Sequence, residues 1–197
     1  MASSPMVFGV YQAQTLANGT QMSRGRLRAQ LRTWLPVLAC AMVFAVESTS
    51  YLGADRTSAP LQRVAEAIFG YGVGLHWELI HHLIRKTGHF MGYGVFCLVC
   101  FRGFWIELQG AASRLSRQLR AHGLAILATF LVASADEFHQ SFLPNRCGQF
   151  SDVLLDTCGG VALGLVLFLV MQTAEGRRHA QARDTCRPEP ACAEAAA

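Results

Sequence analysis

Four apolar blocks, each long enough to cross a membrane, constrain this chain more than any other feature of its sequence. A helix needs about 20 predominantly apolar residues to span the hydrocarbon of a bilayer. The four blocks cover residues 31–51, 86–105, 121–140 and 152–172. Of the 197 residues, 52 % are hydrophobic and only 15 % are charged, which is too apolar for an ordinary soluble domain. The sequence therefore predicts an all-α integral membrane protein, a four-helix transmembrane bundle.

The distribution of basic residues predicts the orientation of this bundle. Cytoplasmic loops carry the excess of Lys and Arg. One side of the predicted spans holds Arg24, Arg26, Arg28, Arg32, Arg102, Arg114, Arg117, Arg120, Arg177, Arg178, Arg183 and Arg187, and the other holds only Arg56, Arg63, Arg85, Lys86 and Arg146. We therefore expect a multi-pass protein of the cytoplasmic (inner) membrane, with both termini in the cytoplasm and two outer loops.

Both ends of the chain lack the apolar pattern of the middle. We expect a disordered N-terminal tail over 1–29, a membrane domain over 30–172 and a disordered C-terminal tail over 173–197. Met22 is an alternative start, because a basic flank follows it. That flank and the first apolar core also resemble a secretory signal with a cleavage site near Ala54, but a retained signal-anchor is simpler because further spans follow.

The first outer loop, residues 53–85, carries apolar residues at helical spacing: Leu61, Val64, Ala65, Ile68 and Phe69. This spacing predicts a short helix lying along the membrane interface. A second helical stretch, 75–85, can lead into the second span without a break.

The polar residues of the spans lie on one level, at the outer ends of the predicted helices. They are Glu47 on the first span, Lys86 and His89 on the second, Asp136, Glu137 and Gln140 on the third, and Asp152 and Asp156 on the fourth, with Arg146 in the loop before the fourth. The inner halves of the spans are nearly free of such groups. Ionisable residues inside a membrane are costly to bury and mark functional sites by default.

Spacing predicts which of these side chains share a helix face, because residues three, four and seven apart do so. The expected stripes are Lys86, His89 and Tyr93 on the second span, Asp136 and Gln140 on the third, and Asp152, Asp156 and Gly160 on the fourth. Asp156 should lie roughly 6 Å deeper than Asp152, at about 1.5 Å per residue, and meet protein or trapped water rather than lipid.

Below these carboxylates, Gly160 and Gly164 form a G-x-x-x-G step that lets another helix approach closely. We favour packing within the bundle over the alternative, a homo-oligomer contact.

Several spaced motifs resemble those of the VanZ-like membrane proteins over about residues 30–172. They are Arg85-Lys86-Thr87-Gly88-His89-Phe90 with Tyr93, Asp136-Glu137-Phe138-His139-Gln140, Pro144-Asn145-Arg146, and Asp152-Val153-Leu154-Leu155-Asp156 with Gly159 and Gly160. The resemblance implies a four-span bacterial protein of the cell envelope and, through the founding member, an association with teicoplanin resistance; the biochemical activity of the family is not established. It also implies that Lys86, His89, Tyr93, Asp136, Glu137, Gln140, Arg146 and Asp152 occupy motif positions. Asp156 and Asn145 depart from it, since Asn and Gly are usual there.

Three functions fit the polar residues. In the first, they only neutralise one another and hold the helix ends together. In the second, they bind an envelope component, either a lipid-linked cell-wall intermediate or a lipoglycopeptide, with Lys86 and Arg146 holding a phosphate or carboxylate. We expect membrane lipids as partners, no nucleic acid and no cofactor.

The third function is an enzyme, a hydrolase or transferase acting on a lipid-linked substrate. His89 would be the general base, oriented by Asp136 or Glu137, and a metal held by His89 and two carboxylates is a variant. The sequence offers no obvious activated nucleophile, because Ser134 lies inside the third span and Ser141 has no recognised motif. The binding function is favoured.

Overall fold

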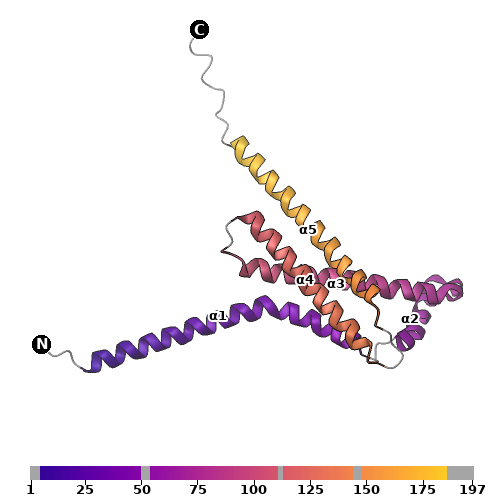
Figure 1. Ribbon diagram of the computed structural model, residues 1–197, viewed down its shortest axis with the longest axis horizontal. Helices are drawn as coiled ribbons and strands as arrows, with labels where there is room; N and C mark the ends of the chain where they lie inside the picture. Colours follow the sequence, from indigo (N-terminus) through magenta and orange to yellow (C-terminus); the bar gives the residue numbers. More distant parts are fainter. Residues whose placement is uncertain (1–4, 50–53, 111–112, 144–147, 186–197) are drawn as a thin grey trace, which may run out of the picture.

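The computed structural model is all-helical and describes residues 5–49, 54–110, 113–143 and 148–185 (Figure 1). Its helices are α1 (Pro5–Glu47), α2 (Ala54–Phe69), α3 (Trp77–Glu107), α4 (Arg114–Gln140) and α5 (Phe150–Thr185), and a 3-10 segment, η2 (Tyr71–His76), joins α2 to α3. Four segments are long and apolar enough to cross a membrane: Gly25–Glu47, Tyr71–Glu107, Arg114–Gln140 and Phe150–Arg183. The predicted all-α fold with four membrane-length helices and one short helix is confirmed.

The first and last helices extend into the segments that the sequence predicts as tails. α1 already begins at Pro5, and α5 continues to Thr185 (Figure 1). The extension of α5 is rich in Ala and Arg, which are good helix formers even where no apolar stripe is present. The structure therefore shows helix within the segments that the sequence predicts as disordered tails. The limits of the membrane domain stay a prediction.

The core of the bundle lies among α3, α4 and α5, and α3 makes its most extensive contact with α5. α3 supplies large buried side chains, including Tyr93 and Phe96, whereas the buried hydrophobic residues of α4 are the alanines at 121, 125 and 133. Small residues let helices approach closely where no hydrophobic effect drives them together. α1 is attached to this core by Phe44, whose ring stacks on that of Tyr93 with centroids 4.2 Å apart.

Two glycines of α5 allow it to sit against α3 and α4. A Cβ atom added at Gly159 would overlap the carbonyl oxygen of Phe90 on α3. At Gly160 it would lie only 3.1 Å from a methyl of Thr129 and 3.2 Å from Cβ of Cys97. The predicted use of the Gly160 step within the bundle is therefore confirmed.

The short helix α2 is tied to the start of α3. Gly70, whose φ of 86° suits glycine, turns the chain from α2 into η2. Trp77 then donates a hydrogen bond from Nε1 to the hydroxyl of Ser58 at 2.7 Å. These contacts hold α2 beside the first turn of α3, at the end of the bundle where α4 leads to α5 (Figure 1).

Candidate functional site

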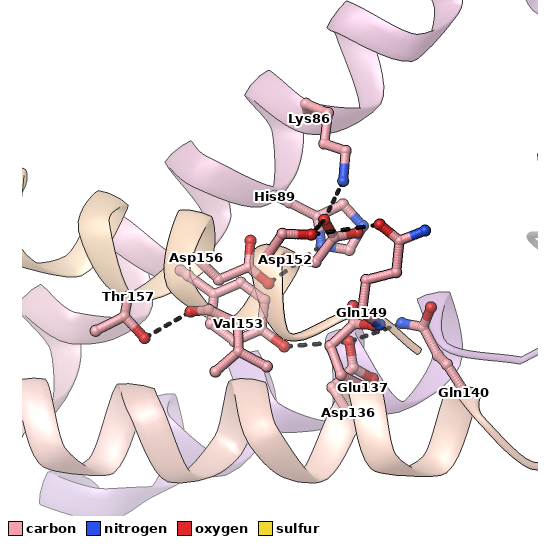
Figure 2. A network of polar contacts seen from close by, with 12 residues as sticks. Lys86, His89, Asp136, Glu137, Gln140, Gln149, Asp152, Val153, Asp156 and Thr157 are labelled. Carbon is pink, nitrogen blue, oxygen red and sulfur yellow. Dashed lines mark hydrogen bonds and ion pairs between the residues drawn. The ribbon is translucent and has the colours of Figure 1, made fainter. Parts of the chain in front are cut away.

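The structure brings together polar residues that the sequence predicts on the second, third and fourth spans (Figure 2). α3, α4 and α5 each contribute, as the stripes of residues predict. We call the set the charged cluster: Lys86, His89, Tyr93, Asp136, Glu137, Gln140, Asp152 and Asp156. Of the two other polar residues predicted at this level, Glu47 is the last residue of α1, a helix outside the three that build the cluster, and Arg146 lies outside the described residues.

The rim of the charged cluster is an ion pair between Lys86 of α3 and Asp152 of α5, and Figure 2 shows Lys86 reaching down to the Asp152 carboxylate. The two side chains are 30 % and 29 % exposed, so water still reaches both. A pair this accessible contributes less than about 1 kcal/mol to stability. The pair therefore leaves both charges accessible to a ligand at little cost to the fold.

Asp136 is held by donors from two helices. Tyr93 donates its hydroxyl to Oδ2 of Asp136 at 3.2 Å, and Gln140 donates from Nε2 to the same oxygen at 3.1 Å. The Tyr93 ring is fully buried and stacked on Phe44, which fixes where its hydroxyl points. Asp136 is thus a fixed acceptor whose orientation depends on α1, α3 and α4 together.

Glu137 holds the chain that enters α5. One of its carboxylate oxygens, Oε2, accepts a hydrogen bond from the backbone N–H of Gln149 at 2.9 Å. The approach is close, because a Cβ atom at Gly148 would overlap the carbonyl oxygen of Glu137. A carboxylate is favourable near the first turn of a helix, where N–H groups lack partners within the helix. Glu137 therefore has a positioning role that its motif alone does not reveal.

Asp156 is the most unusual member of the charged cluster. Its side chain is 1 % exposed, and neither carboxylate oxygen has a hydrogen-bond partner among the described residues. The nearest ionisable group is His89, whose Nδ1 lies 3.6 Å from Oδ2, too far for a good hydrogen bond. The imidazole is 26 % exposed and stacks over Tyr93. His89 thus lies between the buried carboxylate and the surface.

This arrangement corrects the catalytic hypothesis in one respect. The carboxylate beside His89 is Asp156 on α5, and not Asp136 or Glu137 on α4. Both candidate serines use their hydroxyls within α4, since Ser134 donates to the Phe130 carbonyl and Ser141 to that of Phe138. The part of the chain that the structure describes contains no group of three His, Cys, Asp or Glu side chains that could hold a metal ion.

The sequence interpretation missed two polar links beside the charged cluster. Ser48, just after α1, has its hydroxyl 3.2 Å from Nδ1 of His139 on α4, which joins these two helices. The other is the Gln149 N–H described above. His139 lies inside a quoted motif, so its position was a usable signal. The Gln149 link uses a backbone N–H group, which nearly every residue type has, so the sequence gives no signal for it.

A family model described as VanZ/LLP1 matches residues 33–172, which contain every member of the charged cluster and all four apolar blocks except the first two residues of the block 31–51. The chain belongs to the VanZ/LLP1 family. The resemblance predicted from the sequence motifs is confirmed. Neither the comparison with curated proteins nor the comparison with solved structures finds a match. Membership of this family identifies the chain as a multi-span membrane protein. It does not give the activity, which is inferred below from the geometry of the charged cluster.

Proposed function

We propose that this VanZ/LLP1-family protein binds a cell-envelope component through its charged cluster, at the outer face of the cytoplasmic membrane, and thereby supports glycopeptide tolerance. The observation that carries this proposal is the buried Asp156 carboxylate. A buried carboxylate whose ionic neighbour, His89, lies too far away for a good hydrogen bond is poorly compensated, and each such group in a native structure calls for an explanation. A ligand that completes the cluster supplies one, because it would bring the missing donor.

The ligand class follows from the surroundings of the charged cluster. Lys86 and Asp152 present both signs of charge at the rim, which suits a polar head group. Exposed apolar side chains lie close by along the chain, among them Phe138, Phe142 and Phe150. A polar rim beside apolar helix surface suits a lipid-linked cell-wall intermediate or a lipoglycopeptide. Arg146, by its place between α4 and α5, would add a bidentate group for phosphate or carboxylate.

A membrane-embedded enzyme is the second candidate, and one observation favours it. His89 is partly exposed and has a buried carboxylate, Asp156, on its Nδ1 side. A general base oriented in this way can activate water for attack on a bound lipid-linked substrate. With water as the acceptor the protein would be a hydrolase, and with a different acceptor it would be a transferase. Product formation from such a lipid distinguishes it from binding alone.

Ion pairs that serve only stability explain the charged cluster less well. Desolvation offsets much of the attraction in a buried pair, and removing a partner from it is costly. Asp156 lies 3.6 Å from the His89 ring and has no good hydrogen-bond partner among the described residues, so its burial is poorly compensated for a group that would serve stability alone. A purely structural cluster would have no reason to retain it.

Expression of the wild-type protein in a susceptible Gram-positive host tests the proposed function. We expect a higher glycopeptide concentration to be needed to stop growth than in the same host with an empty vector. The protein level in the membrane is measured in parallel by immunoblotting. Unchanged susceptibility at a normal protein level would contradict the glycopeptide part of the proposal.

Reporter fusions test whether the charged cluster faces outward. The excess of arginine at the other end predicts that a reporter after Gln172 is active as a cytoplasmic protein, and that one in the loop between Leu143 and Gly148 is active as an external one. Paired alkaline phosphatase and fluorescent protein fusions report the two sides independently. The reverse pattern would place the site in the cytosol and exclude the envelope ligands named above.

A further inference from the structure

The first turns of α3 project past the charged cluster together with α2. α3 has 31 residues, which is about 46 Å of helix, whereas the hydrocarbon of a bilayer is about 30 Å thick. α3 crosses α4 and α5 obliquely, and its first turns lie to one side of them beside α2 (Figure 1). We call the projecting part the arm and define it as α2, η2 and α3 as far as Arg85.

The side of α2 that faces the rest of the protein is largely polar. Ser58, Gln62 and Glu66 follow one another at four-residue spacing, so they share one side of the helix, and all three are partly buried. Ser58 accepts the hydrogen bond from Trp77 of α3. Oε1 of Glu66 accepts from Gln62 at 2.9 Å and lies close to Gly74 of η2. α2 is therefore attached to η2 and α3 largely through polar contacts.

The apolar stripe of α2, by contrast, is exposed. It consists of Leu61, Val64 and Ile68, and the Ile68 side chain is 67 % exposed. Phe69, at the end of the helix, is exposed as well. An amphipathic helix of a water-soluble domain turns its apolar stripe toward the core and its polar side toward water. The packing of α2 is the reverse, which indicates that its stripe meets an apolar environment outside the chain.

The first turns of α3 are uncovered in the same way. Leu79 and Leu83 precede Lys86 by seven and three residues, so they share its side of the helix. Further along α3 this side is covered, since Tyr93 is fully buried and donates its hydroxyl to Asp136 of α4. Before Lys86 it is open, and Leu79 is 61 % exposed. An apolar surface therefore begins where the charged cluster ends.

This surface continues the lipid-facing surface of the second span. Exposed apolar side chains recur along α3 at four-residue spacing, at Leu79, Leu83, Met91 and Val95, with the exposed Thr87 at the remaining position. Met91 and Val95 lie within the predicted second span, where an exposed apolar side chain of a membrane protein contacts lipid. The lipid-facing surface therefore runs from the span into the arm.

The charges of the arm balance one another. Its three acidic and three basic residues are Asp55, Glu66, Glu78, Arg56, Arg63 and Arg85. Attraction to anionic head groups requires an excess of basic residues, whereas burial of apolar area does not. The composition of the arm therefore favours the acyl chains as its partner over the head groups.

We propose that the arm is inserted in the membrane, with the apolar stripe of α2 and the first turns of α3 among the acyl chains of the leaflet beside the charged cluster. The sequence predicts an interfacial position for the short helix alone, and the structure extends it to η2 and the start of α3. A strong tilt of α3 then accounts for its excess length. Lys86, where the arm ends, lies at the boundary between head groups and acyl chains. The inference is independent of the proposed envelope ligand, because its partner is bulk lipid.

Spin labelling of the full-length protein in phosphatidylcholine nanodiscs tests this insertion. A nitroxide is attached through p-acetylphenylalanine, which leaves the native cysteines unreacted, in place of Ile68, Leu79, Met91 or Arg63. Oxygen concentrates in hydrocarbon and a neutral nickel chelate stays in water, so the relaxation caused by each reports the surroundings of the label. We expect Ile68 and Leu79 to respond to oxygen several-fold more than to nickel, as Met91 in the span should. Arg63, which is exposed on α2 outside the apolar stripe, should respond more to nickel.

Two outcomes of the labelling experiment overturn the proposal. A strong response to nickel at Ile68 and Leu79 would place the arm in water. A weak response to both reagents at these positions would mean that protein, such as a second copy of the chain, covers the apolar stripe.

Hydrogen exchange of two matched variants gives a second test. A charge among acyl chains is costly, and we expect Ile68→Asp to shift the insertion equilibrium of the arm by at least about tenfold. Backbone amides of α2 should then exchange at least about tenfold faster than in the wild-type protein. Arg63→Asp introduces the same residue into the same helix outside the apolar stripe and should exchange nearly as the wild type does. Equal rates in the two variants would contradict insertion.

Discussion

Gly159→Ala is expected to prevent normal accumulation of the folded protein. The added methyl group would overlap the backbone carbonyl of Phe90, and a backbone atom in the middle of α3 cannot move aside as a flexible side chain can. Forced overpacking typically costs about 1–3 kcal/mol, and a clash with backbone should lie at the upper end of this range. We expect membrane levels to fall several-fold, and any purified protein to unfold at a clearly lower temperature in a detergent melt.

Gly176→Ala is the matched control for this change. It makes the same substitution in the same helix, at a position where an added Cβ would meet nothing within 4 Å. Alanine is favoured over glycine in a helix by about 1 kcal/mol, so this variant should be as stable as wild type or slightly more so. Equal levels and equal melting temperatures for the two variants would show that α3 and α5 do not approach as closely as described.

Asp156→Asn is expected to remove function without removing stability. The carboxylate is buried and has no hydrogen-bond partner among the described residues, so the fold gains little from its charge. Neutralising a buried carboxylate that has no good hydrogen-bond partner removes its desolvation penalty, and this gain offsets the loss of the weak contact with His89. The melting temperature in detergent should therefore equal or exceed that of wild type.

Asp152→Asn is the control, one helical turn earlier on α5. It removes the charge that pairs with Lys86, so it should lower stability slightly, by less than about 1 kcal/mol, because both side chains of the pair are partly exposed. The two substitutions make the same chemical change but should move the melting temperature in different directions. A large loss of stability in Asp156→Asn would mean that the carboxylate serves the fold.

The sequence predicts much of this fold because membrane-crossing helices have a strong and simple pattern. Apolar blocks of the right length identify four spans, and a spacing of three or four residues brings Asp136 and Gln140, or Lys86 and His89, to one helix face. Each stripe lies within a single helix. Its existence therefore does not depend on how the helices pack.

Pairing between helices could not be predicted in the same way. Whether His89 meets Asp156 or Asp136 depends on the rotation of α3 and on how deeply α5 sits. That depth is set by the contact of Gly159 with Phe90, between backbones that carry no sequence signal. The lengths of the end helices were missed for a related reason, because propensity without an apolar stripe is a weak guide.

His122 on α4 shows the same limit. Its partners are the carbonyl oxygens of Gln118 and Gly164, which every residue type possesses. In the sequence, the inner halves of the spans look nearly free of ionisable groups. In the structure, the inner half of α4 holds a histidine whose two ring nitrogens both have partners.

The measurement that tests the central claim most directly is glycopeptide susceptibility beside membrane abundance, for wild type and Asp156→Asn in a susceptible Gram-positive host. If the charged cluster acts on an envelope component, the variant should reach the wild-type level in the membrane and give no protection. Full protection by Asp156→Asn at normal abundance would contradict the account, because the buried carboxylate that carries it would then be dispensable.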